Sequence, residues 1–83
     1  MEHYIYKGMF LKGKYDGFGM SFYKNGKVKY KGIYKNNTKN GYGHLYKDKG
    51  TLIYNGTFYE NKYNGNGTLY YENGKIKIGR AHV

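Results

Sequence analysis

The sequence predicts an all-β chain that folds as a meander of hairpins, and two observations support this fold class. Glycine is abundant, with 14 residues, and proline is absent; glycine disfavours long helices because of its high backbone entropy. Tyrosine and glycine also recur at a fixed spacing of 24 residues, beginning at Tyr6, Tyr30 and Tyr54. A period of this length indicates a repeat array, in which each unit buries its apolar face only against its neighbours.

The repeat has a defined order of residue types. Each unit contains a tyrosine, a glycine and an aromatic residue at alternate positions, followed by a Gly-x-Gly segment and a last glycine. The recurring residues are Tyr6, Gly8, Phe10, Gly17 and Gly19, then Tyr30, Gly32, Tyr34, Gly41 and Gly43, then Tyr54, Gly56, Phe58, Gly65 and Gly67. We therefore expect a single domain over residues 1–83, with repeats at 6–29, 30–53 and 54–77 and an incomplete cap or tail at 78–83.

A hairpin turn is predicted in each unit at Asn25-Gly26, Lys49-Gly50 and Asn73-Gly74, because such pairs favour the positive φ angles of two-residue turns. If Lys24 pairs with Lys27 across the first turn, the pairing of the two strands is fixed. The expected pairs are Ser21 with Tyr30, Gly19 with Gly32 and Gly17 with Tyr34, and one period later Leu45 with Tyr54, Gly43 with Gly56 and Gly41 with Phe58. Segments 11–16, 35–40 and 59–64 are expected to form longer polar loops at the other end.

Side chains alternate between the two faces of a strand, so this register predicts one face of tyrosine, glycine and other aromatic residues. Rings are expected to cover the glycines, with their hydroxyls and edges accessible because no second sheet covers them. The opposite face is basic and partly apolar, and its charge and apolarity fall towards the C-terminus. Its candidate binding residues are Lys7, Lys29, Lys31, Lys35, Phe18, Phe22, Tyr42 and Tyr46.

The composition argues for binding rather than catalysis. The net charge of +10, from 15 basic and 5 acidic residues, would attract nucleic acid, anionic lipid or an acidic protein surface. The chain has no cysteine, and its three histidines occupy unrelated repeat positions, so we expect no metal site. The acidic residues lie near turns or the terminus, and no pair of them suggests acid–base chemistry. We expect no enzyme activity, no cofactor and no small-molecule substrate.

The middle unit carries a family resemblance. Its segments Tyr30-Lys31-Gly32-Ile33-Tyr34, Asn40-Gly41-Tyr42-Gly43 and Lys49-Gly50 resemble the MORN repeat (membrane occupation and recognition nexus). The period is 24 rather than the usual 23, and the loop glycine at position 13 is replaced by Asn37 and Asn61, which tolerate left-handed backbone. The resemblance implies an elongated, single-layer, twisted antiparallel sheet with a groove along the aromatic-glycine face.

The resemblance also implies a scaffold role. The first hypothesis is a non-catalytic module that binds a protein partner through the aromatic groove, the basic face or a sheet edge. Alternatives are binding of acidic phospholipid or nucleic acid through the lysine-rich face, and a small viral or bacterial inhibitor or antitoxin of a nucleic-acid enzyme. The unpaired edges at the first strand and at residues 75–80 favour a homodimer. Because residues 1–14 lack a signal-peptide pattern, we expect a cytoplasmic protein, with peripheral membrane attachment as an alternative.

Overall fold

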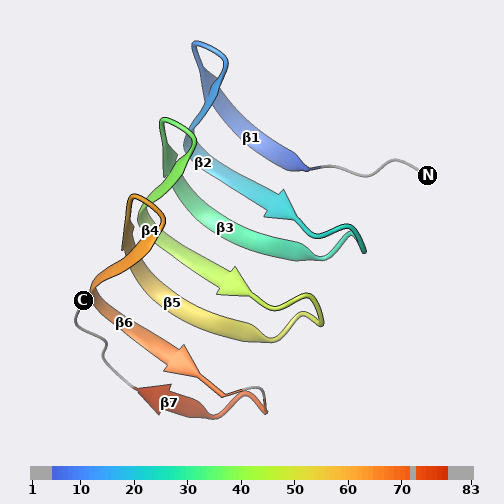
Figure 1. Ribbon diagram of the computed structural model, residues 1–83, viewed down its shortest axis with the longest axis vertical. Helices are drawn as coiled ribbons and strands as arrows, with labels where there is room; N and C mark the ends of the chain where they lie inside the picture. Colours follow the sequence, from blue (N-terminus) through green and yellow to red (C-terminus); the bar gives the residue numbers. More distant parts are fainter. Residues whose placement is uncertain (1–4, 72, 79–83) are drawn as a thin grey trace.

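A computed structural model describes residues 5–71 and 73–78 and confirms the all-β fold (Figure 1). The described residues form one sheet of seven strands that follow one another in chain order: β1 (Tyr6–Leu11), β2 (Lys14–Phe22), β3 (Val28–Lys35), β4 (Thr38–Tyr46), β5 (Leu52–Tyr59), β6 (Lys62–Tyr70) and β7 (Ile76–Ile78). All pairs are antiparallel, so β1 and β7 are the two open edges. The described part contains no helix that could cross a membrane.

The predicted register is confirmed in the centre of each strand pair. Strands β2 and β3 pair through Gly17–Tyr34, Gly19–Gly32 and Ser21–Tyr30, and strands β4 and β5 through Gly41–Phe58, Gly43–Gly56 and Leu45–Tyr54. The same pairing continues between the hairpins, where Gly8 lies opposite Gly19, Gly32 opposite Gly43 and Gly56 opposite Gly67. A row of glycines therefore runs across the sheet from β1 to β6.

The turns at Asn25-Gly26 and its equivalents are three-residue loops, so the predicted two-residue turns are wrong. The amide of Tyr23 donates to the Lys27 carbonyl, and the amide of Gly26 donates to the Tyr23 carbonyl. Only Gly26 has positive φ in this loop, at 88°, which is the pattern of a type I turn followed by a glycine bulge. Lys24 therefore does not pair with Lys27. A register shift between Ser21 and Phe22 compensates for the extra loop residue, which is why the predicted pairs beyond it are right.

The opposite ends of the hairpins carry tight turns instead of the long polar loops predicted there. Leu11 pairs with Lys14, Lys35 with Thr38 and Tyr59 with Lys62, which leaves two residues in each turn. Both residues of the second turn have positive φ, 55° at Asn36 and 70° at Asn37. This is the geometry of a type I′ turn, whose twist matches that of the strands it joins. Most residues predicted to lie in these loops therefore belong to strands: residues 11, 35 and 59 end β1, β3 and β5, and residues 14–16, 38–40 and 62–64 begin β2, β4 and β6.

Asn37 and Asn61 connect successive units. The Asn37 side-chain oxygen accepts a hydrogen bond of 2.8 Å from the Tyr15 amide, and the Asn37 amide donates to the Tyr15 carbonyl at 3.0 Å. Asn61 makes the same two bonds to the backbone of Lys39, at 2.8 and 3.0 Å. The replacement of glycine by asparagine thus adds a side-chain bond between hairpins that glycine could not make.

The core consists of rings that lie over the glycine row. Tyr30 and Tyr54 are fully buried, and Tyr34 and Phe58 are 5% and 3% exposed. A Cβ atom placed on Gly43 would lie 2.3 Å from the Tyr30 hydroxyl oxygen, a distance that no side chain could tolerate. Gly19 and Gly67 are covered in the same way by Tyr6 and Tyr54. The prediction that rings cover glycines is therefore confirmed for this row.

Two further expectations about this face are wrong. Gly17, Gly41 and Gly65 have positive φ, and a Cβ on them would meet Met9, Ile33 and Thr57 on the other face rather than the rings opposite them. The tyrosine hydroxyls are not free either, because Tyr30 donates to the Ile33 carbonyl at 2.9 Å and Tyr54 to the Thr57 carbonyl at 3.0 Å. Burial raises the pKa of both tyrosines, with an opposing contribution from these hydrogen bonds.

Candidate functional site

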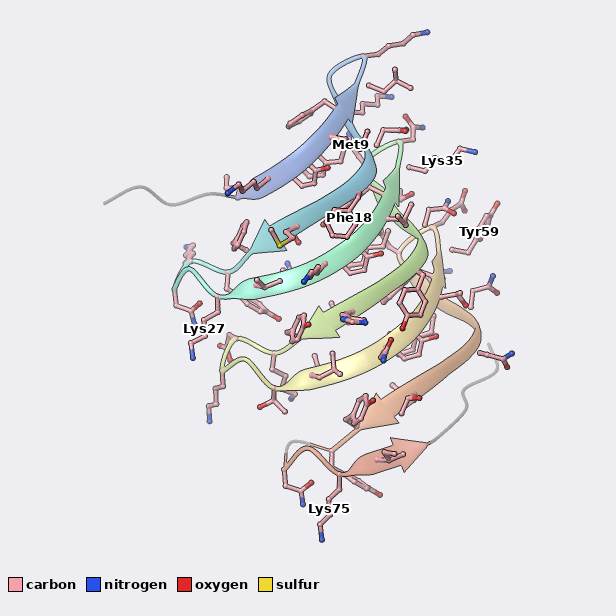
Figure 2. All side chains as sticks on the ribbon, turned by 180° about the vertical axis from the view of Figure 1, so that it is seen from behind. Met9, Phe18, Lys27, Lys35, Tyr59 and Lys75 are labelled. Atoms are coloured by element: carbon pink, nitrogen blue, oxygen red, sulfur yellow. The ribbon has the colours of Figure 1, made fainter. Side chains whose placement is uncertain are left out.

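The aromatic rings of the core occupy one side of the sheet, and we call the other side the open face (Figure 2). Two rows of side chains cross it. One row joins Lys7, Met20, Lys31, His44, Asn55 and Thr68 through successive strand pairs. The second joins Phe18 to Ile33 and Tyr42 to Thr57. Residues that contact a partner on this side would come from several strands at once.

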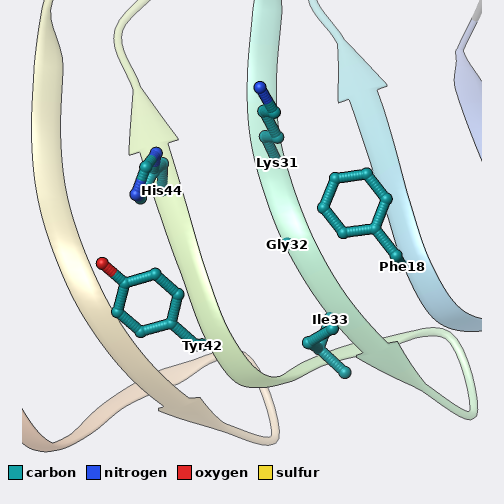
Figure 3. Close-up of a pocket in the computed structure, with 6 residues that line it drawn as sticks. All are labelled: Phe18, Lys31, Gly32, Ile33, Tyr42 and His44. Carbon is teal, nitrogen blue, oxygen red and sulfur yellow. The ribbon is translucent and has the colours of Figure 1, made fainter.

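A hollow of about 180 Å³ lies on the open face over β3 (Figure 3). It is lined by Phe18 from β2, by Lys31, Gly32 and Ile33 from β3, and by Tyr42 and His44 from β4. Phe18 is 48% exposed and Tyr42 55%, although both are large apolar side chains. Exposed apolar groups gathered around a depression with polar residues beside them mark an interaction site.

Positive charge lies at one end of this hollow. Lys31 and His44 form a cross-strand pair on β3 and β4, and no ion pair or hydrogen bond involves the Lys31 ammonium group within residues 5–71 and 73–78. The acidic side chains that the structure describes are elsewhere: Asp16 accepts from the Asn36 amide at 3.3 Å, and Asp48 and Glu60 lie in turns. The hollow therefore combines apolar walls with an uncompensated cation.

Three rings along β4 form the wall of the site. The Tyr42 and His44 rings meet edge to face with centroids 5.6 Å apart, and those of His44 and Tyr46 are 6.3 Å apart. The Tyr42 hydroxyl also donates a 2.5 Å hydrogen bond to the side-chain oxygen of Asn55, and the Tyr46 hydroxyl lies 3.4 Å from Nδ1 of His44. The Tyr42–Asn55 hydrogen bond connects this wall to β5, and the other contacts link the three rings along β4.

The structure brings together only part of the predicted candidate set. Lys31, Phe18 and Tyr42 line the hollow, Tyr46 supports it through His44, and Lys7 lies in the same row two strands away. The remaining three are at the ends of the strands. Phe22 pairs with Val28 next to the loop, and Lys35 pairs with Thr38 at a turn. The Lys29 ammonium nitrogen lies 5.7 Å from the centroid of the Tyr23 ring.

Two residues of the site, Ile33 and His44, were absent from the predicted set. Both alternate with Lys31 or Tyr42 on the same face of a strand, so the period-2 pattern places them correctly. For His44 the sequence predicts only that it binds no metal, because the three histidines occupy unrelated repeat positions. The described residues contain no group of three potential metal ligands. His44 contributes to the site through ring packing with Tyr42 and Tyr46 and through its contact with the Tyr46 hydroxyl.

The aromatic face has its own hollow, of about 390 Å³, between the second and third units. Its lining includes Lys39, Phe58, Lys62 and Tyr63. Lys39 lies where the other units have a tyrosine: the Tyr15 ring stacks on Tyr6 with centroids 3.7 Å apart, whereas the Lys39 ammonium lies 5.7 Å above the Tyr30 ring. Burial, and secondarily the charge of Lys29, lowers the pKa of Lys39.

These features define a class of protein: a single-layer array of β-hairpins whose core consists of aromatic rings packed over glycines on one face of the sheet. A family model for the MORN repeat matches residues 6–28, 30–52 and 54–76. The chain therefore belongs to the MORN repeat family. The three matches leave out Lys29 and Ile53 between them, in agreement with the 24-residue period. No curated protein matches the chain closely enough in sequence to be counted as a relative.

Proposed function

We propose that this chain is a non-catalytic protein-binding module whose partner docks on the open face of the first two repeats. MORN repeats are generally binding or scaffold modules without catalytic activity, and MORN-repeat proteins commonly bind proteins or lipids. The observation that carries the proposal is the cluster of exposed Phe18, Ile33 and Tyr42 beside Lys31. The core rings of the second and third units, in contrast, are buried in the fold: Tyr30, Tyr34, Tyr54 and Phe58.

The asymmetry of the open face supports this location. In the third unit the positions of Lys31, Ile33 and Tyr42 are taken by Asn55, Thr57 and Asn66. These shorter polar groups offer less apolar area, and desolvation of apolar area drives most protein association. We therefore assign the partner to the first and second units.

Photo-crosslinking in an extract of the source cells tests the proposal. A benzophenone amino acid would replace Tyr42 on the open face or, as a matched control, Tyr59 near a two-residue turn; both tyrosines are 55% exposed. We expect one protein to crosslink strongly from position 42 and weakly from position 59. With that protein purified, Tyr42→Ala should weaken binding about tenfold, as for an interface aromatic anchor, and Tyr59→Ala should not. Equal crosslinking from both positions would contradict the proposal.

The arrangement of the lysines favours a protein over acidic lipid or nucleic acid. Lys7 and Lys31 are separated by Met20 in their row, and Lys29 and Lys35 lie at opposite ends of β3. A polyanion would be held by a continuous basic track and would be released by salt. Binding to acidic vesicles or oligonucleotides that is lost at high salt and unaffected by Tyr42→Ala would favour the polyanion instead.

Self-association at the β1 edge is a second candidate, and the exposure of Phe10 favours it. Phe10 is 59% exposed, whereas its equivalents in the later units, Tyr34 and Phe58, are buried. A ring of the preceding unit covers each of these two: Tyr6 lies 5.2 Å from Tyr34 and Tyr30 lies 5.2 Å from Phe58, between ring centroids. A second copy could supply the missing ring and pair with β1. At the other proposed edge, residues 75–78 are described and Arg80 lies outside the described residues. Sedimentation velocity should show a dimer that Phe10→Ser dissociates; a monomer at all concentrations would refute it.

A further inference from the structure

The size of the open-face hollow restricts what can enter it. Sites for drug-sized ligands have volumes of roughly 300–1,000 Å³, whereas this hollow measures about 180 Å³. It is therefore suited to one anchoring side chain of a larger partner. The opposing Phe18 and Tyr42 rings and the Ile33 side chain provide apolar contacts for such a group.

The end of the hollow at Lys31 and His44 requires a different kind of group. Figure 3 shows both side chains next to each other at this end, on neighbouring strands. Lys31 can only donate hydrogen bonds. When Nδ1 of His44 accepts from the Tyr46 hydroxyl 3.4 Å away, Nε2 carries the proton and can donate as well. Two donors at one end of an apolar hollow match a carboxylate.

We propose that the hollow binds an apolar side chain whose neighbouring carboxylate is held by Lys31 and His44. This inference rests on the proposed function and specifies the partner's chemistry. The carboxylate can come from an aspartate or glutamate beside the apolar residue or from the C-terminus of the partner chain. Both sources place an anion a few bonds from an apolar group, so the shared recognition element is an apolar residue joined to a carboxylate.

The chain contains an internal comparison for this site. The corresponding positions one unit later hold Asn55, Thr57, Asn66 and Thr68 in place of Lys31, Ile33, Tyr42 and His44. The backbone there has the same register, with Gly56 opposite Gly67 as Gly32 is opposite Gly43. A segment recognised only through the backbone would bind both places, whereas an apolar residue with a carboxylate should select the hollow at Lys31 and His44.

Titrations followed by amide chemical shifts of the full chain test this proposal. Three short capped peptides would serve as probes: one with phenylalanine followed by glutamate, one with glutamine in place of that glutamate, and one ending in phenylalanine with a free carboxylate. We expect the glutamate peptide, the free-carboxylate peptide or both to shift the amides around Phe18, Lys31 and His44, with the glutamine peptide binding more weakly. The stronger of the two carboxylate peptides identifies the source of the carboxylate.

Charge-matched variants provide the control. Lys31→Gln should weaken binding of the carboxylate peptide about fivefold, the upper range for an exposed ion pair, and leave the glutamine peptide unaffected. Lys12→Gln changes the net charge equally at a distant turn and should have little effect. If neither carboxylate peptide binds more strongly than the glutamine peptide, or if the two variants have equal effects, the carboxylate assignment is overturned. The Tyr42 crosslinking result would still decide separately whether a protein docks on the open face.

Discussion

Replacement of Gly43 by alanine should greatly reduce the free energy of unfolding of this sheet. An alanine Cβ would lie 2.3 Å from the Tyr30 hydroxyl oxygen and 2.5 Å from its Cε1 and Cζ atoms, so the ring must leave its position. Gly43 has no positive φ, and in a strand without a covering ring the change to alanine would be neutral or stabilising. The predicted direction is therefore opposite to that expected from β-propensity alone.

The size of the effect follows from what the Tyr30 ring contributes. The ring is fully buried, it contacts Tyr34 and Phe58 edge to face at 5.0 and 5.2 Å, and its hydroxyl donates to the Ile33 carbonyl. Loss of a buried aromatic side chain costs about 3–5 kcal/mol, and the hydrogen bond accounts for about 1 kcal/mol of that amount. Domains of this kind have total stabilities of about 5–15 kcal/mol, so Gly43→Ala should remove a large part of it.

Urea denaturation followed by circular dichroism measures this change. His44→Ala, at the next residue but on the open face, serves as the control and should cost less than about 1 kcal/mol. A double-mutant cycle with Tyr30→Leu isolates the contact, because Gly43→Ala should cost much less once the ring is gone. Equal effects of Gly43→Ala and His44→Ala, or additivity with Tyr30→Leu, would refute the account of rings covering glycines.

Three further predictions concern the same face and the turns. Lys39→Tyr should add about 0.5–1.5 kcal/mol to the free energy of unfolding, because it places an aromatic ring against Tyr30. The thermal midpoint should rise accordingly; an unchanged midpoint would show that lysine stabilises the Tyr30 ring equally well. Asn61→Gly should lower the free energy of unfolding, measured by urea denaturation, by about 1 kcal/mol, because the side-chain hydrogen bond to the Lys39 amide is lost. Asn61→Ala should lower it by about 1–2 kcal/mol more, because φ is 69° at this position. Equal losses for the two variants would contradict this prediction. Burial raises the pKa of Tyr30, whereas a tyrosine in the unfolded chain titrates near pH 10. As the pH rises, the unfolded chain therefore loses this proton before the folded chain does. The free energy of unfolding should fall above about pH 10, by about 1.4 kcal/mol per pH unit for each such tyrosine. Tyrosinate absorbance followed against pH would show buried tyrosines ionising together with unfolding, whereas reversible titration at pH 10 in a folded chain would refute the prediction.

Much of the fold follows from the positions of glycine and tyrosine. The 24-residue spacing determines the number of hairpins, and the pairing of Gly19 with Gly32 and Gly43 with Gly56 follows from the turn positions. The sequence predicts the candidate site less completely than it predicts the fold. Alternation identifies Lys31 and Tyr42 as neighbours on one face, but the separation of Lys29 and Lys35 from them depends on how far each strand extends.

The sequence by itself determined the repeat, the strand order and the central register, because these depend on local periodicity and on residues that only one backbone conformation suits. Only the tertiary structure decided the turn types, since a three-residue loop with a compensating bulge and a two-residue loop give the same central pairs. The tertiary structure also decided which aromatic rings are buried. The Tyr30 ring is covered by Phe58 of the next unit, which no pattern within one unit specifies, whereas the Tyr54 ring is covered by Tyr63 of its own unit. Because the core rings are buried within the fold, the exposed apolar side chains Phe18, Ile33 and Tyr42 on the open face are the basis of the proposed binding function.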